Sequence, residues 1–471
     1  MDERRGSTLR HTVDGYLGDS SLKRRLLSGS TWAFGGKIGG AAVGIVTNGL
    51  LARMLSPQEF GAYFLTLSIV SLGAVVGSLG LPKTVVRFVA ENVGLSRFGR
   101  ARRAIYTVLG LGVFGTLGVS LAYLLVGDLV GRHLFDSSLL VAVTGLTAAW
   151  IAISVVNEIT AETFRGFHDV RMATLLGGLA TGGKSGGLVM KILLLGTLVL
   201  LWVKSGETDL ATVMLISIGS GSLSVLLSVW LLRGKLSSLD PQVAEDPISS
   251  KEVLHDSIPI LIVALTAFVL QSADIWILGA LRSQEEVAVY AAASRLVTFV
   301  AMPLLIVNLV LPPIVAEMYA QGKTAKLERT LRTFSTLAGV PSILVLAGFM
   351  TLGGPILGLV YGDYYRAGAL VLVILSAAKL VAVWSGSCGL VLQFTGHQAS
   401  MLRVSVLTSA LFIPGALLAA QDYGAVGVAI AVVAATVLQN VILVQVAKRK
   451  TGMWTHVMFS LTPLRKALSK R

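Results

Sequence analysis

The chain alternates long apolar segments with short polar ones along most of its length. Most apolar segments reach the roughly 20 residues that an α-helix needs to cross a bilayer, because each residue advances a helix by ~1.5 Å. Lipid offers no hydrogen bonds to bare backbone groups, so we expect every span to be a helix. The pattern predicts twelve spans, at approximately 29–53, 61–82, 103–126, 138–162, 173–203, 209–232, 255–281, 287–316, 333–360, 367–395, 399–420 and 424–446. The fifth and the tenth are longer than a bilayer needs, which indicates a tilt or a break.

A repeat relates the two halves of the chain. One group of matches, spaced by 227 positions, pairs Ser56 with Ser283, Glu59 with Glu286 and Tyr63 with Tyr290. Further matches, at spacings of 226 to 230, pair Glu91 with Glu317, Phe164 with Phe394 and Gly166 with Gly396. Each copy holds six spans, an even number, so both copies enter the membrane from the same side. The predicted fold class is therefore all-α: a polytopic membrane protein with about twelve transmembrane helices in two parallel six-helix repeats and a cavity at their interface.

The repeat and the polar segments divide the chain into five parts. We expect a polar N-terminal segment (1–27), a first six-helix lobe (28–233), a linker (234–252), a second six-helix lobe (253–447) and a basic tail (448–471). No apolar segment with a small-residue cleavage site precedes the first span, so we expect no cleaved signal peptide.

Composition supports the membrane class and excludes others. Hydrophobic residues make up 54% of the chain and charged residues 14%, whereas a soluble domain has roughly 25% charged residues. The mean hydropathy is +0.77. The net charge of +14 would indicate nucleic acid in a soluble chain, but the basic residues lie mostly in short loops, so we expect no nucleic-acid partner. The single cysteine, Cys388, excludes an internal disulfide and a thiolate metal cluster.

The lysines and arginines also predict the orientation. Most of them lie in the two terminal segments and in the loops on the same side of the membrane. The loops on the other side hold Arg53, Arg132, Lys204, Arg282 and Arg366. Loops rich in lysine and arginine stay in the cytoplasm, so we expect a plasma (inner) membrane protein with both termini cytoplasmic.

Three segments resemble a known family. They are LLARMLSPQEFGAYFLTLSIVSLGAVVGSLGLPKTVVRF (50–88), SADIWILGALRSQEEVAVYAAASRL (272–296) and YGDYYRAGALVLVIL (361–375). They are similar to the polysaccharide and lipid-linked oligosaccharide flippases of the multidrug/oligosaccharidyl-lipid/polysaccharide exporter superfamily, over about residues 22–447. The resemblance implies a MATE-like bundle of two lobes that open alternately to either face. It implies a cargo of polyprenyl-diphosphate-linked oligosaccharide, carried to the outer leaflet for cell-surface polysaccharide or glycan biosynthesis. Membrane lipids, and a polysaccharide polymerase or glycosyltransferases, would be its partners. Twelve spans fit the oligosaccharide branch better than the fourteen-span branch that moves peptidoglycan precursor.

Charged and polar residues inside the spans are candidates for the cargo site, because lipid makes them costly. The basic ones outnumber the acidic ones, and phosphate oxygens take charge-assisted hydrogen bonds from lysine and arginine. The candidates for binding cargo are Lys37, Asn48, Lys184, Arg295 and Lys379. Lys37 and Lys184 sit in matching frames, GGKIGG (35–40) and GGKSGG (182–187), so the alternative is that these glycines only let helices pack while the lysines reach the head groups. We expect Lys191 to reach toward the outer interface. We expect the same interfacial role for Tyr361, Tyr364, Tyr365 and Trp384, with sugar stacking as the alternative.

Asp274 is the candidate for coupling transport to an ion gradient. It takes the position of Thr47 in the repeat, and a carboxylate in the middle of a span costs about 2.5–3.5 kcal/mol. A proton, a bound Na⁺ or a basic partner would offset that cost. The alternatives are therefore a coupling site for H⁺ or Na⁺ and a structural ion pair with Arg295.

Other chemistry finds little support in the sequence. Its six histidines lack metal-ligand spacing. We expect no enzyme activity, no metal and no cofactor. A cation-coupled small-molecule or multidrug exporter of the same superfamily is the alternative function, and it would use Asp274 in an acidic cavity. A membrane scaffold without transport is the third, and it would leave the buried charges without a use.

Overall fold

The computed structural model describes residues 20–177, 186–237 and 248–458, and the described residues form helices joined by short turns. The first half of the chain holds α2 (Ser20–Met54), α3 (Pro57–Gly77), α4 (Leu81–Gly94), α5 (Phe98–Leu129), η1 (Val130–Leu134), α6 (Ser138–Ala142), α7 (Thr144–Gly166), α8 (Val170–Leu176), α9 (Leu188–Ser205) and α10 (Leu210–Ser237). The second half holds α11 (Ser250–Leu281), α12 (Gln284–Leu296), α13 (Thr298–Ala320), α14 (Thr324–Tyr361), η2 (Asp363–Gly368), α15 (Ala369–Ser385), α16 (Cys388–Phe394) and α17 (Gln398–Thr451).

The prediction of an all-helical polytopic membrane protein is confirmed. Among the described residues, nine helices are long and apolar enough to cross a membrane, or ten if the bent pair α12 and α13 forms one span. The eleventh and twelfth predicted spans both lie in α17, whose non-helical backbone at Gly424 separates them. The first predicted span, 29–53, lies within α2.

Several predicted spans are broken. The second predicted span, 61–82, is α3, a tight turn and α4, which continues to Gly94. Gly80, in that turn, has a φ of 76° that favours glycine. Its repeat counterpart, the eighth span, bends by 40° between α12 and α13. The tenth span breaks between α15 and α16, where Gly386 has a φ of 73°. The length of the tenth span therefore indicated a real break.

The glutamates of the repeat make the same contact in each half. Ser56 and Glu59 form a capping box at the start of α3, and Glu59 Oε1 also accepts a hydrogen bond from the Leu210 amide at the start of α10, at 3.3 Å. Glu286, in the first turn of α12, accepts a hydrogen bond from the Ala425 amide at 2.5 Å, just after the break in α17. Each glutamate thus ties the start of the second helix of its half to the start of the last one.

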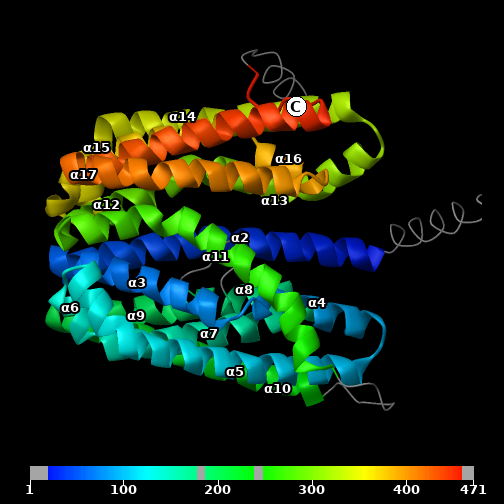
Figure 1. Cartoon of the computed structure of the whole chain (residues 1–471), viewed down its shortest axis with the longest axis horizontal. Helices are drawn as coiled ribbons and strands as arrows, with labels where there is room; N and C mark the ends of the chain where they lie inside the picture. Colours follow the sequence, from blue (N-terminus) through cyan, green and yellow to red (C-terminus); the bar gives the residue numbers. More distant parts are fainter. Residues whose placement is uncertain (1–19, 178–185, 238–247, 459–471) are drawn as a thin grey trace, which may run out of the picture.

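The helices form two lobes (Figure 1). We call α2–α10 the first lobe and α11–α17 the second lobe. Helices α5, α7, α9 and α10 lie together in the lower part of Figure 1, while α14, α15 and α17 lie together in the upper part. Helix α11 crosses from one to the other, and its first half is tied to the first lobe by ion pairs of Arg87 with Asp256 and of Arg100 with Glu252.

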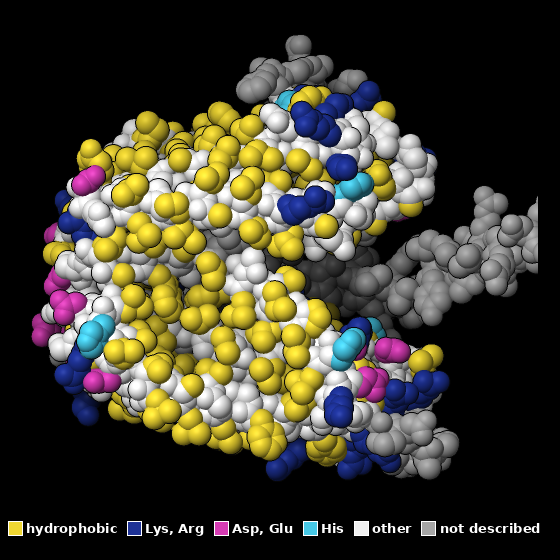
Figure 2. Space-filling view, viewed as in Figure 1, with side chains coloured by type: hydrophobic (Ala, Val, Ile, Leu, Met, Phe, Trp, Pro, Cys, Tyr) yellow, Lys and Arg dark blue, Asp and Glu magenta, His cyan; other side chains and the backbone are white. Residues whose placement is uncertain are grey.

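The lobes touch at one end and separate at the other. At the left of Figure 1, α3 packs against α12 so closely that a Cβ on Gly61 would lie 1.8 Å from the Gln284 carbonyl oxygen. Near the same end, Arg53 of α2 donates a hydrogen bond to the Leu359 carbonyl of α14. Figure 2 shows a hollow between the upper and lower parts that opens to the right, toward the end of α10. We call the closed end the seal.

Part of the segment predicted as a basic tail is packed against the second lobe. After α17, residues 453–458 return along α14 and cross the break between α15 and α16; we call them the strap. The Val457 amide donates to the Trp384 carbonyl at 2.9 Å, and Thr455 Oγ1 donates to the Ser385 carbonyl at 2.8 Å. Ser335 of α14 donates to the Thr455 carbonyl at 2.9 Å. The strap therefore satisfies backbone carbonyls that the break leaves without helical partners.

Candidate functional site

The predicted cargo residues do not gather in one place in the described structure. Lys184 lies outside the described residues, and so does the side chain of Lys37, whose backbone belongs to α2. Asn48 is half-buried on α2, and Lys379 is exposed on α15; neither makes a hydrogen bond or ion pair to another described residue. Arg295 is the candidate that the structure places among other charged and polar groups.

Arg295 lies at the contact between the lobes. It occupies the last turn of α12, directly before the bend into α13. Its guanidinium carbon is 5.0 Å from the ring centroid of Phe64 on α3 of the other lobe, a cation–π arrangement. Tyr63 and Tyr361 are close enough to interact with it electrostatically. Its Nε is buried and has no hydrogen-bond partner among the described residues. A buried guanidinium N–H without a partner is costly and suits an acceptor from a ligand.

Lys191 is a second cation at this contact, and its predicted position was wrong. Its Nζ donates to the Gly40 carbonyl of α2 at 3.4 Å instead of reaching the outer interface. It is also close enough to Arg295 for the two like charges to interact. The prediction failed because the fifth span begins again at Leu188, so Lys191 lies in the first turn of α9 and not near its outer end. The start of a helix favours anions, which adds to the charge of Lys191.

Asp274 accepts a hydrogen bond from a tyrosine in this structure. The Tyr290 hydroxyl donates to Asp274 Oδ2 at 2.8 Å, and the Ile275 amide lies 2.9 Å from Oδ1. Arg295 is within electrostatic range of Asp274, yet no ion pair within 4.0 Å joins these two described residues. The carboxylate and the guanidinium therefore share one polar cluster without forming an ion pair. We call Asp274, Tyr290, Arg295 and Lys191 the polar cluster.

Two tyrosines that were expected at the membrane interface are instead buried in the seal. Tyr361 and Tyr365 are 0% and 2% exposed. The ring centroid of Phe60, on α3 of the first lobe, lies 5.5 Å from that of Tyr365 and 6.4 Å from that of Tyr361. Tyr364 is half exposed, as an interface anchor would be, and Trp384 is half-buried beside the strap. The buried pair therefore forms part of the contact between the lobes.

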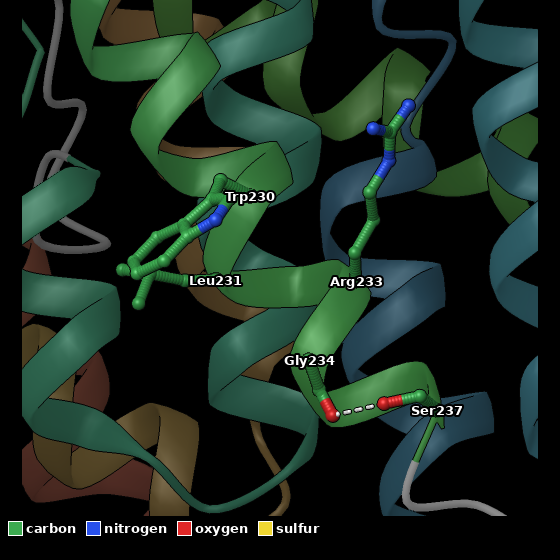
Figure 3. Close-up of a pocket in the computed structure, with 5 residues that line it drawn as sticks. All are labelled: Trp230, Leu231, Arg233, Gly234 and Ser237. Atoms are coloured by element: carbon green, nitrogen blue, oxygen red, sulfur yellow. Dashed lines mark hydrogen bonds between the residues drawn. The ribbon is translucent and has the colours of Figure 1, made fainter.

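A groove of about 540 Å³ lies elsewhere, at the end of α10 (Figure 3). Its lining consists of Trp230, Leu231, Arg233, Gly234 and Ser237. In Figure 3 the Trp230 ring and the Arg233 side chain point in different directions, and Ser237 bonds the Gly234 carbonyl at 2.9 Å. An exposed tryptophan near an arginine at a helix end is typical of anchoring at the membrane interface. The groove shares no residue with the polar cluster.

Comparison with known proteins places the chain in a family. Residues 26–319 match the family model described as "Polysaccharide biosynthesis protein". No curated protein matches the chain.

Solved structures agree on the fold. An inward-facing multidrug resistance MATE family transporter of the MOP superfamily is 14% identical, with a TM-score of 0.69 over 87% of this chain and 94% of the other. An outward-facing structure of such a transporter is also 14% identical, with a TM-score of 0.62 over 91% and 96%. A MOP superfamily transporter from Pyrococcus furiosus, described with a binding pocket of reverse polarity, is 14% identical, with a TM-score of 0.63 over 91% and 96%. The chain thus shares the fold of these transporters. The chain belongs to the polysaccharide biosynthesis protein family and is a multi-pass membrane protein with the fold of MOP superfamily transporters.

Proposed function

We propose that this transporter moves a polyprenyl-diphosphate-linked oligosaccharide from the cytoplasmic to the outer leaflet. The observation that carries the proposal is the meeting of two cations from different lobes, Lys191 of α9 and Arg295 of α12. Two cations held close together repel each other, and an anion between them would relieve that repulsion. A diphosphate offers several anionic oxygens for charge-assisted hydrogen bonds, and the unpartnered Nε of Arg295 offers a donor.

The shape of the molecule supports transport by alternating access. The lobes meet at the seal and part toward the end of α10 and the linker, which the lysine and arginine pattern predicts to be cytoplasmic. A cargo would enter the hollow from that side and leave after the seal opens. On this proposal 28–233 and 253–447 are the moving lobes, both termini are cytoplasmic, and glycosyltransferases and a polymerase supply and consume the glycan.

A cation-coupled exporter of small molecules is the second candidate function. Asp274 favours it, because a carboxylate in a span can take up H⁺ or Na⁺. The polar cluster, however, holds two cations, Lys191 and Arg295, and one carboxylate, so its net charge is positive. A positive cluster suits a diphosphate better than a cationic drug.

Removal of either cation tests the proposal. Lys191→Gln and Arg295→Gln should each slow the flipping of a fluorescent polyprenyl-diphosphate sugar in proteoliposomes by about tenfold or more, because a hydrogen bond to a charged group contributes roughly 1.5–3 kcal/mol. Lys204→Gln is the matched control: it removes an equal charge at the exposed far end of α9 and should leave the rate unchanged. Wild-type rates in both cluster variants would contradict the proposal. If the cluster variants lose more of their cationic-dye export than of their glycan flipping, the second candidate function is favoured.

A further inference from the structure

The carboxylate of Asp274 and the guanidinium of Arg295 lie in one half-buried cluster without forming an ion pair. Opposite charges attract each other more strongly at such a site than in bulk water, because less water screens them. Yet Arg295 Nε has no hydrogen-bond partner among the described residues, while both oxygens of Asp274 are engaged by Tyr290 and by the Ile275 amide. An arrangement that leaves a buried donor free beside a carboxylate requires something that holds the carboxylate in place.

Tyr290 is placed to do this. It is fully buried on α12, one turn and a half before Arg295, and its hydroxyl reaches across to Asp274 on α11 at 2.8 Å. A buried phenol has a single proton to donate, and the bond to Oδ2 uses it. Rotation of Asp274 toward Arg295 would break that bond and leave the phenol unsatisfied, which costs free energy in a buried site.

The repeat shows that this bond belongs to the second lobe alone. Tyr63 is the counterpart of Tyr290, and Thr47 is the counterpart of Asp274. Thr47 donates to the Val43 carbonyl of its own helix at 2.7 Å, and the Tyr63 ring packs against Phe64 and Trp150. The tyrosine occurs in both copies, but a carboxylate for it to hold occurs only beside Arg295.

We propose that Tyr290 is a positioning residue that holds the Asp274 carboxylate away from Arg295, so that the guanidinium stays available to the anionic head group of the cargo. This inference rests on the proposed function, because it takes Arg295 as a ligand of that head group. Without the hydroxyl, Asp274 is free to form an ion pair with Arg295 and competes with the cargo. Tyr290 then affects the affinity for the cargo only through Asp274 and does not contact the cargo itself.

A mutant cycle with a soluble probe tests the inference. The probe is farnesyl diphosphate, bound to the full-length protein in detergent, with uncharged farnesol as the comparison. We expect Tyr290→Phe to weaken farnesyl diphosphate binding about tenfold, the size of the coupling between contacting charged residues, and to leave farnesol binding unchanged. In the Asp274→Asn background no carboxylate competes, so adding Tyr290→Phe should change nothing.

Controls separate this role from a purely structural one. Tyr123→Phe removes another buried tyrosine hydroxyl, bonded to Thr147 on the far side of the first lobe, and should leave binding unchanged. Unaltered affinity in Tyr290→Phe would overturn the inference. So would a loss that persists when Asp274→Asn is added, and this arm remains informative if the single variant folds poorly. Arg295→Gln tests the proposed function separately: unaltered farnesyl diphosphate affinity there refutes the cargo site, whereas a loss there without any Tyr290 effect refutes only the positioning role.

Discussion

Gly61 is the residue on which closure of the seal depends most directly. Its helix, α3, meets α12 where a Cβ would lie 1.8 Å from the Gln284 carbonyl oxygen and 2.6 Å from the carbonyl carbon. Both atoms belong to the backbone, so no side-chain rotation relieves the clash. Ordinary contact begins near 3.4 Å, so Gly61→Ala requires the two helices to separate by at least about 1.6 Å. Overpacking of this kind costs about 1–3 kcal/mol, which shifts a two-state equilibrium by roughly 5- to 150-fold.

The cost falls on the sealed state alone, so Gly61→Ala should increase the population with the seal open. A cysteine at Ala288 reports this: Ala288 is fully buried, lies one helical turn after Gln284 on α12, and is the repeat counterpart of Gly61. In purified protein with Cys388→Ala, we expect Gly61→Ala to raise the maleimide labelling rate of this cysteine at least fivefold. Gly118→Ala is the control, since a Cβ there meets nothing within 4 Å. Equal labelling in all three proteins would refute the argument that this contact forms the seal.

Two further predictions concern the strap and the orientation. A chain that ends after Thr451 leaves the Trp384 and Ser385 carbonyls without the strap's hydrogen-bond donors, which costs about 1–3 kcal/mol for each carbonyl. Its unfolding temperature, measured by tryptophan fluorescence, should therefore fall by several degrees, whereas a chain that ends after Met458 should unfold at the wild-type temperature. Equal unfolding temperatures for the two shortened chains would contradict the role of the strap. In a Cys388-free background, a cysteine at Asp363 should react with an impermeant reagent added outside intact cells and one at Gln242 should not, whereas the opposite pattern would reverse the orientation expected from the basic residues.

Local sequence patterns were sufficient to predict the helices and the repeat. The apolar segments predicted spans because hydrophobicity at this length is a property of each segment alone. The repeated serines were visible because Ser56 and Ser283 both cap the start of a helix. The break in the tenth span was visible as excess length. Arg295 was a candidate because its charge interrupts an apolar segment.

Contacts between helices that are distant in the sequence could not be predicted from the sequence pattern. Tyr361 and Tyr365 looked like interface anchors because they follow a span, and their burial depends on Phe60, which comes from the other lobe. Lys191 was misplaced because α9 begins at Leu188, which puts Lys191 in the first turn of that helix. The sequence also left the alternatives for Asp274 open, because its hydrogen-bond donor, the Tyr290 hydroxyl, comes from the next helix.

The position of the two cations has a consequence for how cargo and conformation are linked. Lys191 belongs to the first lobe and Arg295 to the second, and they meet beside the seal. The repeated glutamates tie the second helix of each lobe to its last, so each lobe is braced at this end. A motion that opens the seal must therefore move the two cations relative to each other. On the proposed function, a diphosphate held by both would bind the two states with different affinity. That difference is the thermodynamic requirement for a cargo to shift a conformational equilibrium.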